Sequence, residues 1–187
     1  MPKLRLFLSL NPAESVISEL GTIQRKLKSL YSSGNIRWEE PDKFHMTLRF
    51  LGDVNEADMV PLKETLQRLR FDFESLLFAA DKIGFFPESR FPNVIYAAFN
   101  ETGNNSEVLV GFIDRIIYNF GVKPEKRFIP HITLGRFNRS RRVKITEPVD
   151  VKMGTFTAEF DSFCIMQSIL TPKGSVYKTL SKINFRK

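Results

Sequence analysis

The sequence predicts an α+β fold in which two pseudo-symmetric lobes, each an antiparallel-rich sheet with outer helices, flank a central cleft. The chain has 187 residues, 42% hydrophobic and 12% aromatic, which is enough for one packed domain. Each half contains a strand pattern, a helix pattern and a further strand that carries His-x-Thr-Leu, at His45 and at His131. We therefore expect a single bilobal domain over 1–187, with interleaved lobes and approximate repeat halves at 1–88 and 89–187.

The first predicted elements are a strand and a helix. KLRLFLSL, from Lys3, alternates polar and apolar residues as a half-buried strand does. Asn11 and Pro12 come next, a pair typical of a helix start. Apolar residues then recur at helical spacing until the chain reaches Gly34, where we expect the helix to have ended.

The next elements lead through the first histidine. A short strand is expected at Ile36–Trp38, and FHMTLRFLG predicts a longer one. A second helix should begin near Asn55 or Asp58, with Pro61 in or near its first turn. An extended segment is expected at Phe73–Ile83, followed by the loop FFPESRFPN.

The second half repeats this series. VIYAAF, from Val94, predicts a strand, and an apolar stripe at helical spacing comes after it and closes at Gly121. FIPHITLGRF predicts the strand of the second histidine. The tail supplies a strand region at Thr155–Leu170, broken once, and a strand at Val176–Phe185, joined by the turn TPKGS.

The positive charge of the chain is concentrated in one segment. The net charge is +7, and the segment from Lys123 to Lys144 holds eight basic residues and one acid, so it accounts for the whole excess. The basic residues are Lys123, Lys126, Arg127, Arg136, Arg139, Arg141, Arg142 and Lys144. They form either a solvated basic loop or an electrostatic footprint for a polyanion. His131 lies within the segment, which favours the polyanion.

The remaining composition argues for a cytoplasmic protein without a membrane segment. Cys164 is the only cysteine, so no internal disulfide forms, and its apolar surroundings predict a buried, inert thiol. Apolar runs such as Leu76–Ala80 are far shorter than the roughly 20 residues of a membrane span. Lys3 and Arg5 interrupt the first apolar stretch, which argues against a signal peptide. We expect a monomer.

The two histidines begin the most specific pattern in the sequence. Both are followed by Thr at the second position and Leu at the third. Side chains alternate between the faces of a strand, so His45, Thr47 and Arg49 are expected on one face, and His131 and Thr133 on one face of the other strand. A two-fold relation between the lobes would bring these polar faces to one cleft.

Several chemistries can be weighed for this pair of rings. Metal binding needs three or more ligands, and the sequence has neither a third His nor a Cys cluster. No Ser or Cys elbow for nucleophilic catalysis is found. Two imidazoles suit a reaction that takes one proton and gives another near neutral pH, as phosphodiester cleavage does. Threonine hydroxyls and arginines can hold the non-bridging oxygens, on which charge builds.

Two stretches resemble a known family. IRWEEPDKFHMTLRFLGDV and RFIPHITLGRF are similar to the signature strands of the 2H phosphoesterases, in particular the RNA 2′,3′-cyclic phosphodiesterases, also called 2′-5′ RNA ligases. SILTPKGSVY is similar to the closing hairpin of that group. The resemblance runs from Lys3 to about Phe185. It implies a bilobal α+β fold, no metal or other cofactor, and hydrolysis of RNA or nucleotide 2′,3′-cyclic phosphate ends to 2′-phosphates.

The resemblance also assigns roles to residues. It implies that His45 is the general acid and His131 the general base, and that Thr47 and Thr133 hold the phosphate. Positive charge around His131 agrees with this, because it favours the neutral ring that a base needs. The family places a further phosphate-binding arginine five residues after the second histidine, here Arg136.

Arg136 requires an irregular strand. Strict alternation would turn it towards the core, so we expect a bulge or a strand end at Gly135. The equivalent position after the first histidine is Phe50, which either lines a base pocket or packs in the core. Arg49 is a second candidate substrate contact, with a surface ion pair as the alternative. Trp38 either packs within a lobe or stacks on an unpaired base.

Three other functions stay open on the sequence. The chain could hydrolyse another small cyclic phosphate, such as a cyclic nucleotide or an ADP-ribose cyclic phosphate. It could bind RNA ends without turnover, although binding alone needs no matched acid and base. Ligation to a 2′-5′ linkage, the reverse reaction in the same cleft, is the third.

Overall fold

The computed structural model describes residues 2–31, 35–87, 90–124, 127–138, 144–145, 151–172 and 174–185. The strands are β1 (Lys3–Leu10), β2 (Ile36–Trp38), β3 (Met46–Asn55), β4 (Leu76–Phe86), β5 (Val94–Glu101), β6 (His131–Phe137), β7 (Thr157–Phe160), β8 (Ser162–Thr171) and β9 (Gly174–Asn184). The helices are α1 (Glu14–Leu30), α2 (Met59–Gln67) and α3 (Asn105–Asn119), with short 3-10 helices η1 (Pro41–Lys43) and η2 (Glu56–Asp58).

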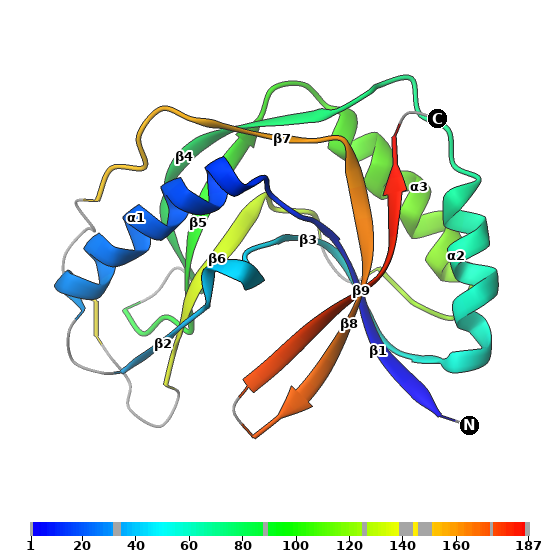
Figure 1. Ribbon diagram of the computed structural model, residues 1–187, viewed down its shortest axis with the longest axis horizontal. Helices are drawn as coiled ribbons and strands as arrows, with labels where there is room; N and C mark the ends of the chain where they lie inside the picture. The colour runs from blue at the N-terminus through cyan, green and yellow to red at the C-terminus, as the bar shows by residue number, and fades with distance from the viewer. Residues whose placement is uncertain are drawn as a thin grey trace.

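The described strands form one curled antiparallel sheet (Figure 1). Its order is β7-β4-β5-β6-β3-β1-β8-β9. The short strand β2 pairs with the last three residues of β6, Gly135 to Phe137. At the centre, β3 and β6 meet through the single registered pair Met46 and Ile132. Each half of this order holds four strands in matching antiparallel arrangement, so an approximate two-fold axis passes near this pair. The predicted α+β fold with two pseudo-symmetric lobes is confirmed.

One half of the sheet takes its strands from both ends of the chain, and the other half takes them from the middle. β4 precedes residue 88 but pairs with β5, whereas β8 and β9 come after it but extend the sheet from β1 (Figure 1). Strands from before and after residue 88 therefore meet within one half of the sheet. The single domain with interleaved lobes, and its division into repeat halves near residue 88, stay predictions.

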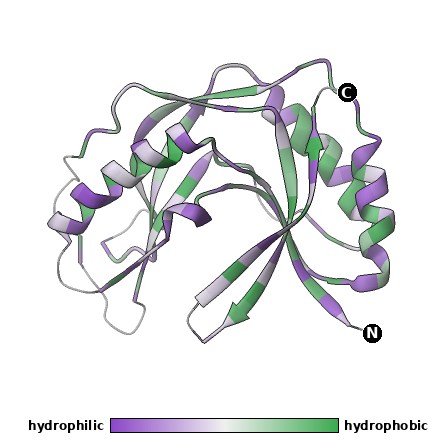
Figure 2. Ribbon diagram, viewed as in Figure 1, coloured by the Kyte–Doolittle hydropathy of each residue, from purple (hydrophilic) through white to green (hydrophobic). Residues whose placement is uncertain are grey.

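The core forms where the helices pack their apolar stripes against the sheet. Hydrophobic and hydrophilic residues alternate along all three α-helices (Figure 2). Leu20 and Leu27 of α1 and Ile113 and Ile117 of α3 are fully buried together with the apolar faces of β3 and β6. Each side chain of this kind contributes about 1.5–3 kcal/mol of burial free energy, so the two central strands are firmly held.

The start of α1 differs from the prediction. Ala13, not Asn11, precedes the first helical residue, and no side chain caps the helix. Asn11 instead accepts a hydrogen bond from Ser9 Oγ at 2.8 Å, and its Nδ2 lies 3.9 Å from Met166 Sδ. The amide is used to satisfy buried Ser9 at the end of β1, so it is not available to the helix. The predicted end near Gly34 lies outside the described residues.

Other element boundaries differ from the predicted ones by a few residues. β3 runs on to Asn55, so η2 and α2 come after it, and Pro61 lies in the first turn of α2 as expected. β4 extends to Phe86, into the predicted loop. The tail breaks once, at Asp161, and Gly121 has the positive φ of 76° expected of a residue that closes a helix. Of the chain's described helices, none has the length and apolar character required to cross a lipid bilayer.

Candidate active site

Both histidines lie at the start of a central strand. His45 immediately precedes β3, and His131 is the first residue of β6. The residues next in sequence, Met46 and Ile132, are fully buried in the core and pair with each other. Each ring is therefore carried by the backbone next to that pair, and the rings are close enough that the charge of His131 lowers the pKa of His45.

The two rings make the same hydrogen bond. His45 Nδ1 donates to the carbonyl oxygen of Lys43 at 2.7 Å, and His131 Nδ1 donates to that of Ile129 at 2.7 Å. A carbonyl oxygen only accepts, so the proton of each neutral ring is on Nδ1. Nε2 of neither ring is bonded to a residue that the structure describes. Each Nε2 can therefore take or give a proton.

Aromatic side chains brace His45. Its ring lies 5.0 Å from Phe7 of β1 and 5.2 Å, edge to face, from Tyr177 of β9. Phe7 belongs to a small cluster with Cys164 and Met166, separate from the main core. Cys164 is buried there, and burial raises the pKa of its thiol, so it is inert as expected.

His131 is braced in the same manner. Its ring lies 5.0 Å from Phe86 and 5.3 Å from Tyr96, both at steep angles. Phe86 and Tyr96 stack on each other at 4.1 Å. Gly84 provides the space, because a Cβ at that position would collide with the Tyr96 ring. Sequence analysis missed all four bracing rings, since each is on a strand brought to the motif strands only in three dimensions.

The threonines lie two residues after the histidines, on the half-exposed side of their strands. Thr47 and Thr133 are partly exposed, between buried neighbours. Neither hydroxyl hydrogen-bonds to any residue in the described part of the chain. Both remain available as donors to a bound anion.

A bulge comes directly after Thr133. Thr133 pairs with Tyr96, but the next registered pair is Gly135 with Ile95, so Leu134 is the extra residue. Both Leu134 and Gly135 are buried, and Arg136 turns outward. The irregularity that Arg136 required is confirmed, and it begins one residue before Gly135.

The first motif has the same bulge. Thr47 pairs with Ser9 and Arg49 with Leu8, so Leu48 is the extra residue. The Leu of both His-x-Thr-Leu stretches is therefore the point at which side-chain alternation slips. Arg49 occupies the position equivalent to Gly135, and Phe50 occupies that of Arg136.

This slip corrects the expectation that Arg49 shares a face with His45. Its guanidinium makes a two-point ion pair with Asp114 of α3, at 2.6 and 2.9 Å, and is only 11% exposed. Arg49 therefore forms an ion pair, the alternative to a substrate contact. Phe50 is 72% exposed, with its ring 6.2 Å from Phe7, so it does not pack in the core.

Gly135 is needed for close packing. A Cβ there would lie 2.8 Å from Cγ2 of Ile36 and 3.0 Å from Cε3 of Trp38. Trp38 packs against the core at this point, with Lys28 Nζ 6.0 Å from its ring. Trp38 therefore packs within its lobe while staying partly exposed, and base stacking stays a prediction.

Arg136 is held near both histidines by an acid. Its Nε donates to Glu39 Oε1 at 3.2 Å, and its side chain is 43% exposed. Glu39 is fixed through its own backbone, because its amide donates to Leu134 and its carbonyl accepts from Gln24. The guanidinium keeps free donors towards solvent.

Burial and neighbouring charges set the pKa of each ring. Burial is the main reason that the pKa values of His45 and His131 lie below the ordinary value. The Arg136 charge lowers both further, and the backbone hydrogen bonds oppose the shifts. The Glu39 carboxylate raises the pKa of His45 alone. The two rings therefore differ in their neighbouring charges: the Glu39 carboxylate raises the pKa of His45, and the charge of His131 lowers it.

The basic segment is described only in part. Lys126, Arg139, Arg141 and Arg142 lie outside the described residues. Arg127 is exposed and pairs with Glu107 at 3.5 Å, and Lys123 and Lys144 are exposed. A continuous footprint for a polyanion stays a prediction.

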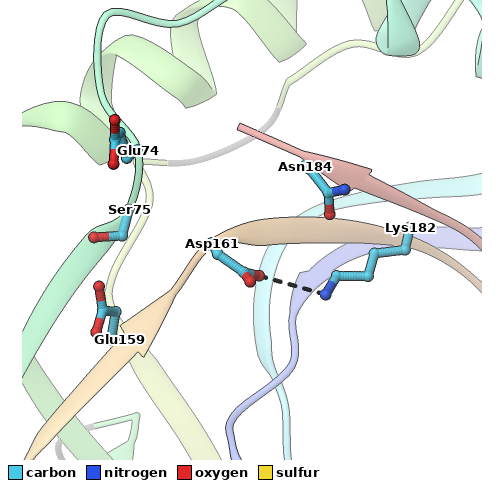
Figure 3. Close-up of a pocket in the computed structure, with 6 residues that line it drawn as sticks. All are labelled: Glu74, Ser75, Glu159, Asp161, Lys182 and Asn184. Carbon is cyan, nitrogen blue, oxygen red and sulfur yellow. Dashed lines mark ion pairs between the residues drawn. The ribbon is translucent and has the colours of Figure 1, made fainter. Parts of the chain in front are cut away.

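A hollow elsewhere has the opposite charge. This hollow has a volume of about 470 Å³. It lies where the start of β4 meets β7, the start of β8 and the end of β9 (Figure 3). It is lined by Glu74, Ser75, Glu159, Asp161, Lys182 and Asn184. Lys182 pairs with Asp161 at 3.5 Å, so the remaining carboxylates disfavour a phosphate ligand. Within the described ranges, no three His, Cys, Asp or Glu side chains are grouped to hold a metal.

Comparison with protein families identifies the chain. The family described as LigT like Phosphoesterase matches residues 10–96 and 100–177. The chain belongs to this family. The resemblance to the 2H phosphoesterases is thereby confirmed, as is the expectation of an enzyme.

Curated relatives of this LigT-like phosphoesterase agree over nearly the full length. The RNA 2′,3′-cyclic phosphodiesterase of Methanocaldococcus jannaschii is 31% identical over 185 residues, which cover 96% of this chain and 99% of the relative. The enzyme of the same name from Aeropyrum pernix is 31% identical and covers 88% of this chain and 95% of the relative.

Solved structures share the fold. TT0787 of Thermus thermophilus has a TM-score of 0.77 at 26% identity, covering 97% of this chain and 98% of its own. Escherichia coli LigT, solved with 3′-AMP, has a TM-score of 0.79 at 18% identity and covers 99% of each chain. The second likeness concerns the fold alone.

Proposed function

We propose that this phosphoesterase hydrolyses RNA 2′,3′-cyclic phosphate ends to 2′-phosphates, with His45 as general acid and His131 as general base. One observation carries the proposal. Two rings, on adjacent strands about an approximate two-fold axis, have the same fixed tautomer and an Nε2 without a described protein partner. A cyclic phosphodiester needs one proton removed and one supplied on opposite sides of phosphorus, which such a pair can do.

The reaction proceeds in line. Nε2 of neutral His131 takes a proton from water as the water oxygen bonds to phosphorus. The bond between phosphorus and the 3′ oxygen breaks, and protonated His45 gives its Nε2 proton to that oxygen. One water is consumed, and the products are a 2′-phosphate and a 3′-hydroxyl. Exchange with solvent then returns both rings to their starting states.

The non-bridging oxygens gain charge in the transition state and need donors. The hydroxyls of Thr47 and Thr133 and the outward guanidinium of Arg136 are the groups proposed to supply them. Each threonine stands in the same relation to its own ring, which suits a phosphate centred between the lobes.

The acid and base assignment rests on charge. An acid must be protonated before it acts, and Glu39 raises the pKa of His45 but not that of His131. The Arg136 charge lowers the pKa of both rings, and the His131 charge lowers that of His45, so the Glu39 carboxylate is the charge that favours a protonated His45. Glu39 therefore supports His45 as the acid.

RNA is proposed over smaller cyclic phosphates because the full-length relatives carry that name. Ligation stays a prediction. It would use the same groups, with the 5′-hydroxyl of a second RNA attacking phosphorus in place of water. Cleavage of the 2′-5′ linkage would release that hydroxyl again.

The test uses an RNA with a 2′,3′-cyclic phosphate end, incubated with purified protein in EDTA. We expect a 2′-phosphate product, distinguished from the 3′ isomer by phosphorus NMR, and no effect of the chelator. A 3′-phosphate product would contradict the direction of cleavage. Complete loss in EDTA, restored by Zn²⁺ or Mn²⁺, would contradict metal-free acid–base catalysis. Binding without turnover would make the protein an RNA-end binder.

A further inference from the structure

A second arginine lies beside Arg136. Arg37 of β2 is its registered partner in β6, and paired residues of antiparallel strands project from the same face, roughly 5 Å apart. Both side chains are exposed. Sequence analysis gave Arg37 no role, because β2 is only three residues long and its partner strand is about a hundred residues away.

The two arginines differ in their partners. Arg136 is paired with Glu39, which balances one positive charge. Arg37 makes neither a hydrogen bond nor an ion pair with any residue in the described part of the chain. The pair therefore carries one uncompensated positive charge, on a guanidinium whose donors are free for an anion.

Arg37 also lies next to the histidine site. Its charge lowers the pKa of Tyr177, although burial raises that pKa more. Tyr177 is the ring packed edge to face on His45. Arg37 Nη1 lies 3.6 Å from the point where a Cβ of Gly174, at the end of the β8–β9 hairpin, would be. Arg37 is thus separated by Tyr177 from His45, the proposed general acid.

The two arginines border a hollow. It has a volume of about 490 Å³, within the range of ligand pockets, and Asn93 and Val94 line it together with β2. Amide and guanidinium groups suit the phosphate and sugar of a nucleotide, and no carboxylate is among its described lining residues.

We propose that Arg37 binds the phosphodiester on the 5′ side of the terminal nucleotide, and so makes the enzyme prefer oligonucleotides to mononucleotide cyclic phosphates. The inference rests on the proposed function. Arg136 contacts the cyclic phosphate, and its neighbour Arg37 meets the next phosphate along the strand. A guanidinium forms two parallel hydrogen bonds to phosphate, whereas a mononucleotide with a 5′-hydroxyl offers no second phosphate.

The test compares kcat/KM for a dinucleotide and a mononucleotide, both ending in 2′,3′-cyclic phosphate. Wild-type protein should prefer the dinucleotide. Arg37→Ala should reduce this preference about tenfold, the loss expected of one charge-assisted contact, and Arg37→Lys should restore part of it. Arg68→Ala removes another exposed arginine, beside α2, and is the matched control, which should keep the wild-type preference.

The outcomes separate the two proposals. If the wild type turns over neither substrate, the proposed function fails. If it turns over both without preference, or if Arg37→Ala lowers both equally or leaves the ratio unchanged, the role of Arg37 is overturned while the function stands. Thermal unfolding of each variant verifies that the fold is retained.

Discussion

His45 and His131 are held by equivalent bonds, each Nδ1 donating to the carbonyl oxygen two residues earlier at 2.7 Å. The bond fixes the tautomer and the ring orientation at once. A neutral ring so held presents a lone pair on Nε2, and a protonated ring presents a proton there. The same local geometry can therefore serve an acid in one lobe and a base in the other, and neighbouring charges must decide which is which.

Replacement of either ring should remove proton transfer and leave the fold. We expect His45→Ala and His131→Ala each to lower kcat by at least about 10²-fold. Each ring is partly exposed, so the unfolding midpoint should fall only by about 2–4 °C, the shift that accompanies roughly 1 kcal/mol in a chain of this size. Steady-state kinetics and thermal unfolding measure the two effects. Full activity in either variant would remove the central proposal.

The pH profile should be displaced towards acid. The rate needs one ring protonated and the other neutral, so kcat/KM should be bell-shaped, with its maximum midway between two macroscopic pKa values. Burial lowers both pKa values below the ordinary 6.5, so the maximum should lie below pH 6.5. A maximum above pH 7 would contradict this account of the site.

Glu39 should distinguish the two rings. Its carboxylate raises the pKa of His45, so Glu39→Gln should lower that pKa and weaken the acid. NMR titration of the free protein, with each ring assigned from its Ala variant, measures the shift. Glu40→Gln changes an exposed neighbour and is the matched control. An unchanged or higher pKa of His45 in Glu39→Gln would refute the charge argument for its role.

A substrate with an activated leaving group tests the direction of proton flow. A leaving group of low pKa departs without protonation, so it needs no general acid but still needs a base for water. Such a cyclic-phosphate analogue should restore turnover to His45→Ala and not to His131→Ala. Rescue of His131→Ala instead would exchange the two roles.

The salt dependence of RNA affinity should show whether the basic segment contacts RNA. If Arg139, Arg141 and Arg142 contact an RNA backbone, neutralising all three should reduce the slope of log affinity against log salt by about 2, at roughly 0.7 per single-strand contact. Fluorescence titration over a salt series measures the slope. Neutralising Lys63, Arg68 and Arg70, near α2, provides the control and should leave it unchanged. Equal slopes in wild type and test variant would make the segment a solvated loop.

The sequence by itself determined the motif strands and the fold class. His-x-Thr-Leu recurs, and the period-two alternation within each stretch placed Met46 and Ile132 in the core and both pairs of His and Thr on the other side. These inferences held because alternation is a property of the local backbone and needs no partner strand. The likeness of the two stretches to a family pointed to the chemistry for the same reason.

Only the tertiary structure decided where the side chains beyond each threonine point. The bulges at Leu48 and Leu134 arise from register with β1 and β5, and they turn Arg49 to Asp114 while Arg136 turns outward. Pairing at long range also brought Tyr177 against His45, and Arg37 beside Arg136. A strand's local pattern fixes which of its residues alternate, but the register against its neighbours fixes where that alternation slips.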